Sequence, residues 1–250
     1  MTTPDTDPAT GLPIGPRIVD PSPAPGPQRT TLTGRYVSVT ALDPVAHADS
    51  LYATTSGPEN ERLWLYLFDG PFTSRAEFDA YLTRIASVED RLYYAILDNT
   101  SGRAVGHACY LRIEPAQRCI EVGGILYTPT LQRTPGATEA MYLMARYVFE
   151  DMGYRRYEWK CHALNAPSRR AALRLGFTYE GVFRQHMIMK GRNRDTAWFS
   201  MLDSEWPARK AAFEQWLDPA NFDVDGRQKI SLSALNDVDP ESRFRNTGRG

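Results

Sequence analysis

Three strand-like runs follow one another between residues 92 and 127, and they constrain the fold more than any other feature of the chain. The runs cover residues 92–98, 104–113 and 119–127, and each is rich in aliphatic, aromatic and β-branched side chains. Asn99-Thr100-Ser101-Gly102 is a short turn that joins the first two. Because a short turn returns the chain beside itself, these runs predict neighbouring antiparallel strands of one sheet.

Helical segments flank these strands. Ser74 and Glu77 form a capping box that opens a helix ending near Val88. An apolar stripe predicts a second helix over residues 138–152, which Gly153 ends. Further strands are expected at 35–42, 156–161, 177–189 and 196–203, and further helical segments at 45–54, 60–67, 165–176 and 205–216. This order predicts an α+β fold, a mixed and mostly antiparallel sheet with helices on its faces.

Proline marks the N-terminal segment, since eight of the 18 prolines lie within the first 28 residues. A segment of this kind, without apolar periodicity, buries too little surface to offset the entropy of ordering it. We therefore expect a flexible tail over residues 1–30, one domain over 31–235 and a second, polar tail over 236–250.

Charge and composition exclude several classes of protein. The 29 Lys and Arg residues balance 30 Asp and Glu, which argues against a dedicated nucleic-acid-binding protein. No apolar stretch approaches the roughly 20 residues of a membrane span. Cys109, Cys119 and Cys161 have no paired spacing, and no secretory leader is readable, so we expect a cytoplasmic protein. We expect no metal, and a homodimer is left open.

The stretch from Glu121 to Ala140 carries the first candidate for chemistry. A strand there leads through a glycine-containing turn into a helix, whose first N–H groups and dipole form an anion site. Thr134 and Thr138 could add hydroxyls and Arg133 a charge. An ordinary capped turn is the alternative interpretation.

A second set of residues follows in the next helix and strand. Asn165 and Pro167 mark a helix start, and Ser168 lies in the first helical turn. Leu175-Gly176-Phe177 ends that helix, and Glu180-Gly181 lies in the following strand.

Together, these motifs resemble the GNAT superfamily of acyl-CoA-dependent N-acetyltransferases, within it the branch of ribosomal-protein N-terminal alanine acetyltransferases. The resemblance covers roughly residues 32–206. Gln132–Ala137 is similar to the family's acyl-CoA loop, and the later motifs are similar to its N-x-x-S, L-G-F and E-G. The resemblance implies a splayed sheet whose cleft binds acetyl-CoA as co-substrate.

The resemblance also implies which residues bind that co-substrate. Pantetheine would bond to the backbone of Ile125, Leu126 and Tyr127, and Asn165 would meet its amide region. The pyrophosphate would lie on the N–H groups between Arg133 and Thr138. The expected cofactor-binding residues are Ile125, Leu126, Tyr127, Gln132, Arg133, Thr134, Gly136, Ala137, Thr138 and Asn165.

The chain departs from the family pattern at three positions. Pro135 replaces the loop's first glycine and has no N–H to donate. Ala172 stands where many members have a tyrosine acid, so the resemblance makes Ser168 the candidate that protonates the leaving thiolate. Met187 stands where the branch has a glutamate.

The general base is therefore open. Glu121 is our first candidate and His186 our second, and the alternatives are an ion pair with an arginine and an ordinary strand residue. His107 shares a strand face with apolar residues and is expected to be core.

The acceptor pocket is expected beside the short helical pieces, where Trp64, Tyr66, Phe68 and Asp69 could form an aromatic and acidic wall. The alternative is that Trp64 and its neighbours are core. The sequence thus predicts transfer of an acetyl group to a primary amine, on a small molecule or a protein N-terminus, by direct attack in a ternary complex. A catalytically silent CoA-binding or regulatory module is the alternative.

Overall fold

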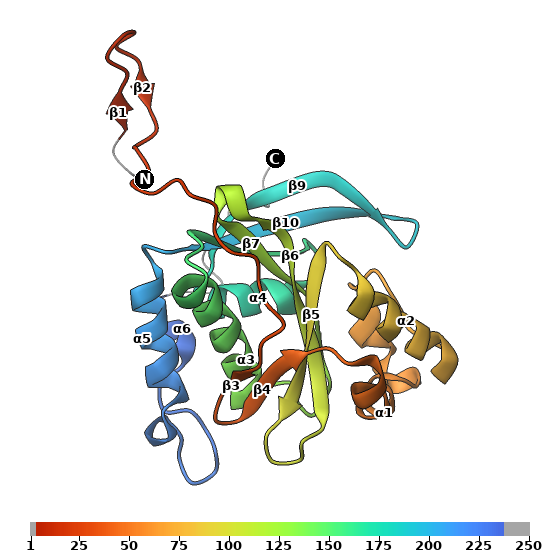
Figure 1. The fold of residues 1–250 in the computed structure, drawn as a ribbon. Coiled ribbons are helices and arrows are strands. Elements are labelled where there is room, and N and C mark those ends of the chain that lie inside the picture. Colours follow the sequence, from red (N-terminus) through yellow and green to blue (C-terminus); the bar gives the residue numbers. More distant parts are fainter. Residues whose placement is uncertain (1–3, 238–250) are drawn as a thin grey trace, which may run out of the picture.

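The computed structural model of the protein describes residues 4–237. Its centre is an eight-stranded sheet with the order β3-β4-β5-β6-β7-β8-β10-β9 (Figure 1). The strands are Leu32–Thr33 (β3), Val37–Ala41 (β4), Arg91–Asp98 (β5), Ala104–Glu114 (β6), Cys119–Tyr127 (β7), Arg156–His162 (β8), Thr178–Met189 (β9) and Arg192–Leu202 (β10). Within this sheet, β7 and β8 run parallel and the other neighbours antiparallel. The predicted mixed sheet is confirmed.

Helices cover both faces of the sheet, and each face has its own apolar core. One core packs under α1, α2 and the 3₁₀ helix η1, and the other under α3, α4 and α5 (Figure 1). The helical segments are Pro44–Thr55 (α1), Pro58–Trp64 (η1), Arg75–Ser87 (α2), Pro115–Gln117 (η2), Pro135–Arg146 (α3), Tyr147–Asp151 (η3), Ala166–Arg174 (α4), Trp206–Leu217 (α5), Pro219–Asn221 (η4) and Leu232–Leu235 (α6). None of the helices within residues 4–237 combines the length and apolarity that crossing a bilayer requires.

Local signals placed most helix starts correctly, with one correction. The capping box of Ser74 and Glu77 is confirmed. Helix α3 begins at Pro135, three residues before the expected start, because Thr134 caps it and proline fits the first helical position. The expected helix also does not continue as an α-helix to Met152, since its last turn is the π-helical segment η3.

The hairpin of β9 and β10 differs from the expectation as well. We expected a five-residue turn over 190–194, but β10 already begins at Arg192. Lys190 and Gly191 alone form the turn, with φ values of 49° and 71°. Two residues with positive φ match the right-handed twist of the flanking strands, which explains the tight turn.

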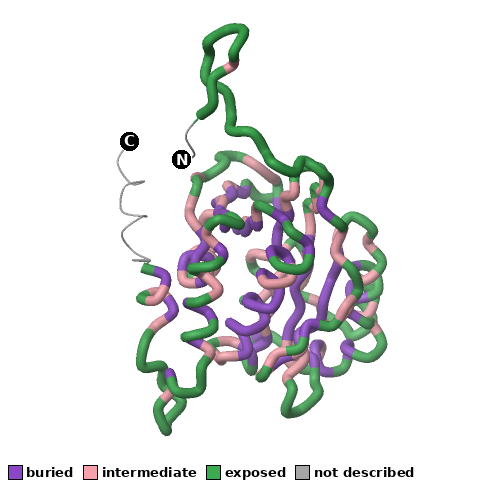
Figure 2. The backbone as a smooth tube through the Cα atoms, turned by 60° about the vertical axis from the view of Figure 1, so that its left-hand side comes forward, coloured by how far each residue is buried: buried purple, intermediate pink, exposed green. Residues whose placement is uncertain are grey.

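The two chain ends differ in how they meet the domain. A short hairpin, Asp5–Thr6 (β1) and Pro13–Ile14 (β2), projects into solvent (Figures 1 and 2). The following segment lies along the domain, where Asp20 pairs with Arg118. At the other end Asn236, which we expected to begin a flexible tail, is buried and donates a hydrogen bond to the carbonyl of Arg174. The rest of that expected tail, residues 238–250, lies outside the described residues.

Candidate active site

Strands β7 and β8 pair for four residues and then separate. Their register runs from Cys119–Arg156 to Val122–Trp159. Residues 123–127 of β7 and 160–162 of β8 therefore border an open wedge in the sheet. This wedge is the splay that the sequence comparison with the family implied.

Two glycines lie where β7 turns away. Gly124 has a φ of +56°, and a Cβ atom there would lie 2.9 Å from the Tyr93 hydroxyl oxygen and 3.0 Å from Cys109 Sγ. Only glycine fits this backbone and this close approach. The apex of the splay therefore depends on a backbone conformation that other residues would strain.

A buried histidine, His107, holds the backbone at Gly124 in place. His107 Nδ1 donates to the carbonyl of Gly124 over 2.9 Å, and the Tyr81 hydroxyl donates to His107 Nε2 over 3.1 Å. Burial lowers the pKa of His107 to about 4, so the imidazole is neutral at physiological pH. The expectation that His107 is a core residue is confirmed.

The start of α3 lies where β7 ends, and its side chains are largely engaged within the protein. The Thr134 hydroxyl donates to the Leu131 carbonyl and accepts from the N–H of Ala137. Thr138 is buried and accepts from Arg174 across 2.6 Å. Each hydroxyl thus has a partner within the protein, and its contact with a bound anion stays a prediction. The backbone N–H groups of this turn are available to bind an anion. So is the side chain of Arg133, which is exposed and has a φ of 63°.

Pro135 fits this turn without loss of helix structure. It occupies the first helical position, where an N–H would have no partner within the helix. Gln132 lies beside it and donates from Nε2 to the carbonyl of Tyr127 over 2.9 Å. Gln132 therefore ties the loop to the end of β7.

Helix α4 brings Ser168 to the other side of the splay. The N–H of Ser168 donates to Asn165 Oδ1 over 3.1 Å, which is the helix cap expected from the sequence. The indole of Trp159 donates to Ser168 Oγ over 3.0 Å. The Cys161 thiol also hydrogen-bonds to this side chain, so the hydroxyl proton of Ser168 reaches another acceptor when it turns away from that sulfur.

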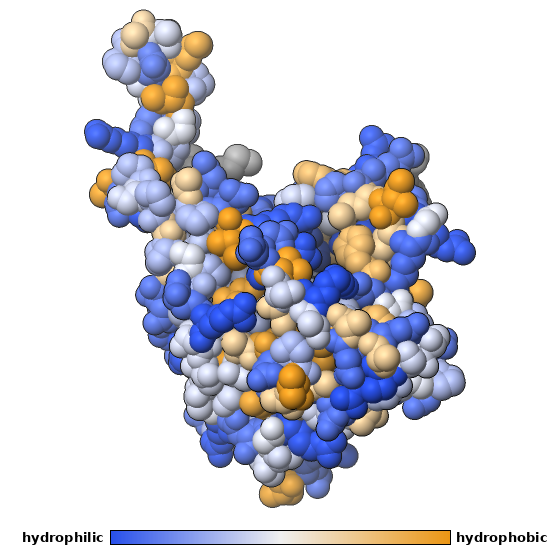
Figure 3. Space-filling model, turned by 45° about the vertical axis from the view of Figure 1, so that its right-hand side comes forward, coloured by the Kyte–Doolittle hydropathy of each residue, from blue (hydrophilic) through white to orange (hydrophobic). Residues whose placement is uncertain are grey.

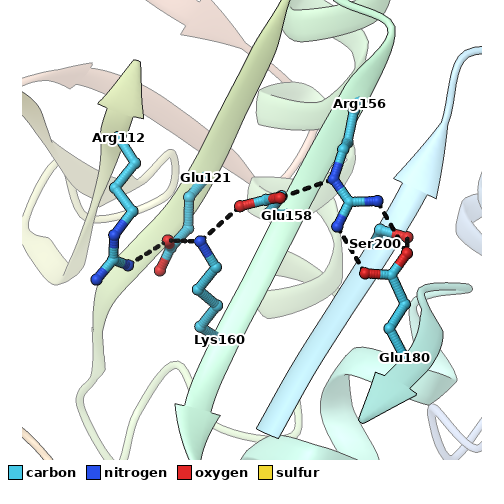
Figure 4. A network of polar contacts seen from close by, with 7 residues as sticks. All are labelled: Arg112, Glu121, Arg156, Glu158, Lys160, Glu180 and Ser200. Atoms are coloured by element: carbon cyan, nitrogen blue, oxygen red, sulfur yellow. Dashed lines mark hydrogen bonds and ion pairs between the residues drawn. The ribbon is translucent and has the colours of Figure 1, made fainter. Parts of the chain in front are cut away.

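A chain of charged side chains crosses the opposite face of the sheet (Figure 4). Glu121 Oε2 binds Arg112 at 2.5 Å and Lys160 at 3.0 Å. Lys160 also binds Glu158 at 2.6 Å, and Arg156 continues the chain at 2.7 Å from Glu158. Arg156 further pairs with Glu180, which accepts a hydrogen bond from Ser200.

Lys160 is a member of this network whose burial was not expected from the sequence. Its side chain is only 3% exposed and lies 3.7 Å from the centre of the Trp198 ring. Side chains two positions apart on a strand point to the same face of the sheet. Glu158 and Lys160 therefore share the face that Glu121 occupies on the neighbouring strand β7, and this period could have revealed the position of Lys160. Glu121 thus pairs with an arginine, as the alternative interpretation held, and also with a lysine that we did not expect.

Glu121 nevertheless keeps one oxygen toward the splay. Both ion pairs involve Oε2. A Cβ atom at Gly123 would lie 3.5 Å from Oε1, which places Oε1 beside the glycine at the apex. Glu121 is thus a carboxylate fixed at the point where the two strands part.

The four residues expected to form the acceptor wall have different surroundings. Trp64 is 1% exposed and lies in the core, as the alternative interpretation held. Asp69 pairs with Arg84. Tyr66 packs against the His162 ring at 5.2 Å between ring centres, and the ring of Phe68 is 51% exposed.

His186 lies on the β9–β10 hairpin. Its Nδ1 is 3.0 Å from the Thr196 hydroxyl oxygen, and its ring contacts Phe183 and Trp198. The pKa of His186 is lowered, first by burial and then by the positive charges of Arg112, Arg194 and Lys160. These interactions place His186 over the same face as Glu121, whereas Ser168 contacts the opposite side of β8.

The sheet thus opens between two parallel strands, and a capped helix start lies at the mouth of the opening. The profile of the GNAT acetyltransferase domain matches residues 40–178 of the chain. The chain belongs to this family, the acetyl-CoA-dependent N-acetyltransferases.

Solved structures agree with this assignment. A GCN5-related N-acetyltransferase from Brucella melitensis is 49% identical, with a TM-score of 0.84 over 87% of this chain and 98% of that one. A GNAT-family protein from Chromobacterium violaceum is 36% identical, with a TM-score of 0.73 over 79% of this chain and 98% of that one. Both matches extend across nearly all of the related chain.

A curated relative is the uncharacterized N-acetyltransferase YnaD of Bacillus subtilis (strain 168). It is 28% identical over 103 residues, which are 41% of this chain and 59% of that protein. The match thus spans less than two thirds of the relative's length. Because these relatives are described only at the level of the family, the ribosomal-protein branch stays a prediction.

Proposed function

We propose that this protein transfers the acetyl group of acetyl-CoA directly to a primary amine, with both substrates bound at once. The observation that carries the proposal is the splay, where the pairing of β7 and β8 stops at Val122 and Trp159. Residues 123–127 lack a partner strand on that side, so peptide groups there can bond to the amides of pantetheine, apart from the carbonyls of Gly124 and Tyr127, which already accept hydrogen bonds. The pyrophosphate end would lie on the first N–H groups of α3, beside Arg133.

The reaction needs three groups in place. The neutral amine attacks the thioester carbon, and a backbone N–H of the open part of β7 stabilises the oxyanion. A base removes the proton of the attacking nitrogen. The carbon–sulfur bond then breaks, and an acid donates a proton to the thiolate.

We assign the acid to Ser168 and the base to Glu121. Ser168 Oγ accepts from Trp159, and its proton would turn from the Cys161 sulfur to the leaving thiolate, after which solvent restores it. Glu121 Oε1 lies beside Gly123, whereas Oε2 holds Arg112 and Lys160. His186 remains the second candidate for the base.

The acceptor would enter from the face that α1, η1 and α2 cover. Tyr66 and Phe68 border this entrance with the β9–β10 hairpin. Figure 3 shows the surface hollowed where the lobe of this hairpin meets the body of the domain, and apolar side chains gather on that lobe. Such a hollow suits a small amine or the end of a chain.

Calorimetric titration with acetyl-CoA and measurement of CoA thiol released with a panel of amines test the proposal. We expect micromolar binding, and thiol release that depends on the amine. Arg133→Glu should weaken acetyl-CoA binding at least tenfold, because it puts a negative charge beside the pyrophosphate. Arg227→Glu is the matched control, since Arg227 is 80% exposed and lies in the C-terminal segment.

Gly136 is a less useful position for this test. A Cβ atom there would lie 2.8 Å from Val37 Cγ1, so a larger residue would disturb the core as well as the binding loop. Binding that Arg133→Glu leaves unchanged would contradict the placement of the pyrophosphate. The absence of thiol release with every amine would contradict the proposed activity itself.

A further inference from the structure

Arg194 on β10 is a buried arginine for which the described part of the chain supplies no carboxylate. The residue is 8% exposed. Its Nη1 contacts the sulfur of Met189 at 3.9 Å, and its buried Nε has no hydrogen-bond partner among the described residues. The guanidinium carbon lies 4.9 Å from the centre of the Phe68 ring. A thioether and one ring face are weak partners for a full positive charge.

This situation is costly for a guanidinium and differs from that of Arg156, a half-buried arginine at the other end of β8. A charge removed from water needs an opposite charge or several hydrogen bonds to offset its lost hydration. Arg156 has both, since it binds the carboxylates of Glu158 and Glu180. Arg194 has neither within residues 4–237, although five N–H groups are available to it.

Arg194 lies beside the proposed acceptor site. It faces Phe68 at the entrance. The pKa of His162 is lowered chiefly by burial and next by the charge of Arg194. The same charge contributes to the lowered pKa of His186, whose first cause is also burial. The carboxylate whose charge reaches Arg194 is Glu121, and Glu121 Oε2 is already bound by Arg112 and Lys160.

A second cation borders the same segment. Lys190 Nζ donates to the carbonyl of Trp64 over 2.7 Å, and among the described residues it forms no ion pair. Lys190 and Arg194 thus approach the segment from Trp64 to Phe68 from the same hairpin. The carboxylates whose charge reaches these two cations, Asp69 for Lys190 and Glu121 for Arg194, are each bound in an ion pair with another cation.

We propose that the amine acceptor carries an anionic oxygen group, a carboxylate or a phosphonate, that pairs with Arg194 while the amine faces the splay. This inference rests on the proposed acetyltransferase function and names its substrate class. The guanidinium fork can bind such a group through two parallel hydrogen bonds. The anion would satisfy a buried charge that the described residues leave without a counterion.

The test compares amines that differ only in the anionic group. Three series have one, two or three carbons between the amine and a carboxylate, a phosphonate or a neutral carboxamide. Thiol release gives kcat/KM for each, corrected for the fraction of neutral amine. We expect an anionic member to exceed its carboxamide at least tenfold, which corresponds to about 1.4 kcal/mol.

Variants separate recognition by Arg194 from a general effect. Arg194→Gln should remove the preference for the anion while the carboxamide is still acetylated, and Arg194→Lys should keep part of it. Arg75→Gln is the matched control, because exposed Arg75 already has two carboxylate partners, Asp49 and Asp79. A carboxylate without an amine, such as propionate, should inhibit the wild type competitively with the amine but not Arg194→Gln.

Three results would overturn the inference. The first is equal use of anionic and neutral amines by the wild type, and the second is a preference that survives in Arg194→Gln. The third is acetylation of only those amines that lack an anion. If Arg194→Gln does not fold, propionate inhibition of the wild type and of Arg194→Lys decides between these results. Failure of the proposed function is distinguishable, because then no amine at all releases thiol.

Discussion

The indole nitrogen of Trp159 lies 3.0 Å from the hydroxyl oxygen of Ser168, and this bond joins the last residue of β8 that pairs with β7 to the first turn of α4. Trp159 is the residue at which the sheet begins to open. The side chain that we assign as the acid is therefore positioned by the same residue that marks the splay.

Replacement of Ser168 by alanine tests this assignment. We expect kcat to fall by about tenfold to a hundredfold. The loss should be smaller than for a reaction with a poor leaving group, because a thiol already ionises near pH ~8.5 and needs less help from an acid. Acetyl-CoA affinity should stay within about twofold. Trp159→Phe is the control, since it removes the same hydrogen bond and keeps the hydroxyl. Equal rates in Ser168→Ala and wild type would remove Ser168 from the mechanism.

The two candidate bases predict different variants to be impaired. With Glu121 as the base, Glu121→Gln lowers kcat/KM by about a hundredfold and His186→Gln by less than about fivefold. Glu158→Gln controls for the broken ion pair, because it also removes a partner of Lys160.

The pH profile separates the candidates further. A base must be unprotonated, so activity is lost as pH falls through its pKa. The pKa of His186 is lowered from 6.5, chiefly by burial, so a limb due to His186 would lie below pH 6.5 and disappear in His186→Gln. We expect the acid limb to be the same in wild type and in that variant. A limb that vanishes would make His186 the base.

His107 predicts how stability depends on pH. Burial lowers its pKa from 6.5 to about 4, so the unfolded chain binds a proton more readily than the folded one. Stability from this residue is complete above pH 6.5 and is lost as pH falls from 6.5 to 4, by about 3 kcal/mol in total. Denaturant unfolding at several pH values should show this slope, and His107→Leu should reduce it. An unchanged slope in the variant would contradict the assignment.

Arg194 predicts an unusual effect on stability. Replacement of a buried arginine by methionine removes a desolvation cost without breaking an ion pair of the described residues, so the melting temperature of Arg194→Met should equal or exceed that of the wild type. Differential scanning calorimetry without substrate measures this. A loss of more than about 2 kcal/mol would mean that Arg194 supports the fold rather than ligand binding.

Most of the fold could be predicted because its signals are local. Alternating apolar residues gave β7 with the bounds observed, and the capping box at Ser74 gave the start of α2. The turn of Lys190 and Gly191 was misjudged because the residues after it are polar and charged, although Arg194 is buried. Polar composition predicts a loop only when tertiary contacts do not override it.

The site could be predicted less well, since its parts meet through strand pairing. Glu121 and Lys160 lie 39 positions apart in the sequence, and only the parallel register of β7 and β8 brings them together. Trp64 was ambiguous because an aromatic residue in an amphipathic segment fits a core as well as a pocket. The burial of Arg194 has no sequence signal, because it depends on the hairpin folding over Phe68.

The decisive measurement for acetyl transfer to an anionic amine is the release of CoA thiol from acetyl-CoA in the presence of matched amines. We expect release that requires the amine, is fastest with an amine that carries an anionic group, and yields the N-acetylated amine in equal amount. Thiol release at the same rate without any amine, or none with every amine offered, would contradict it.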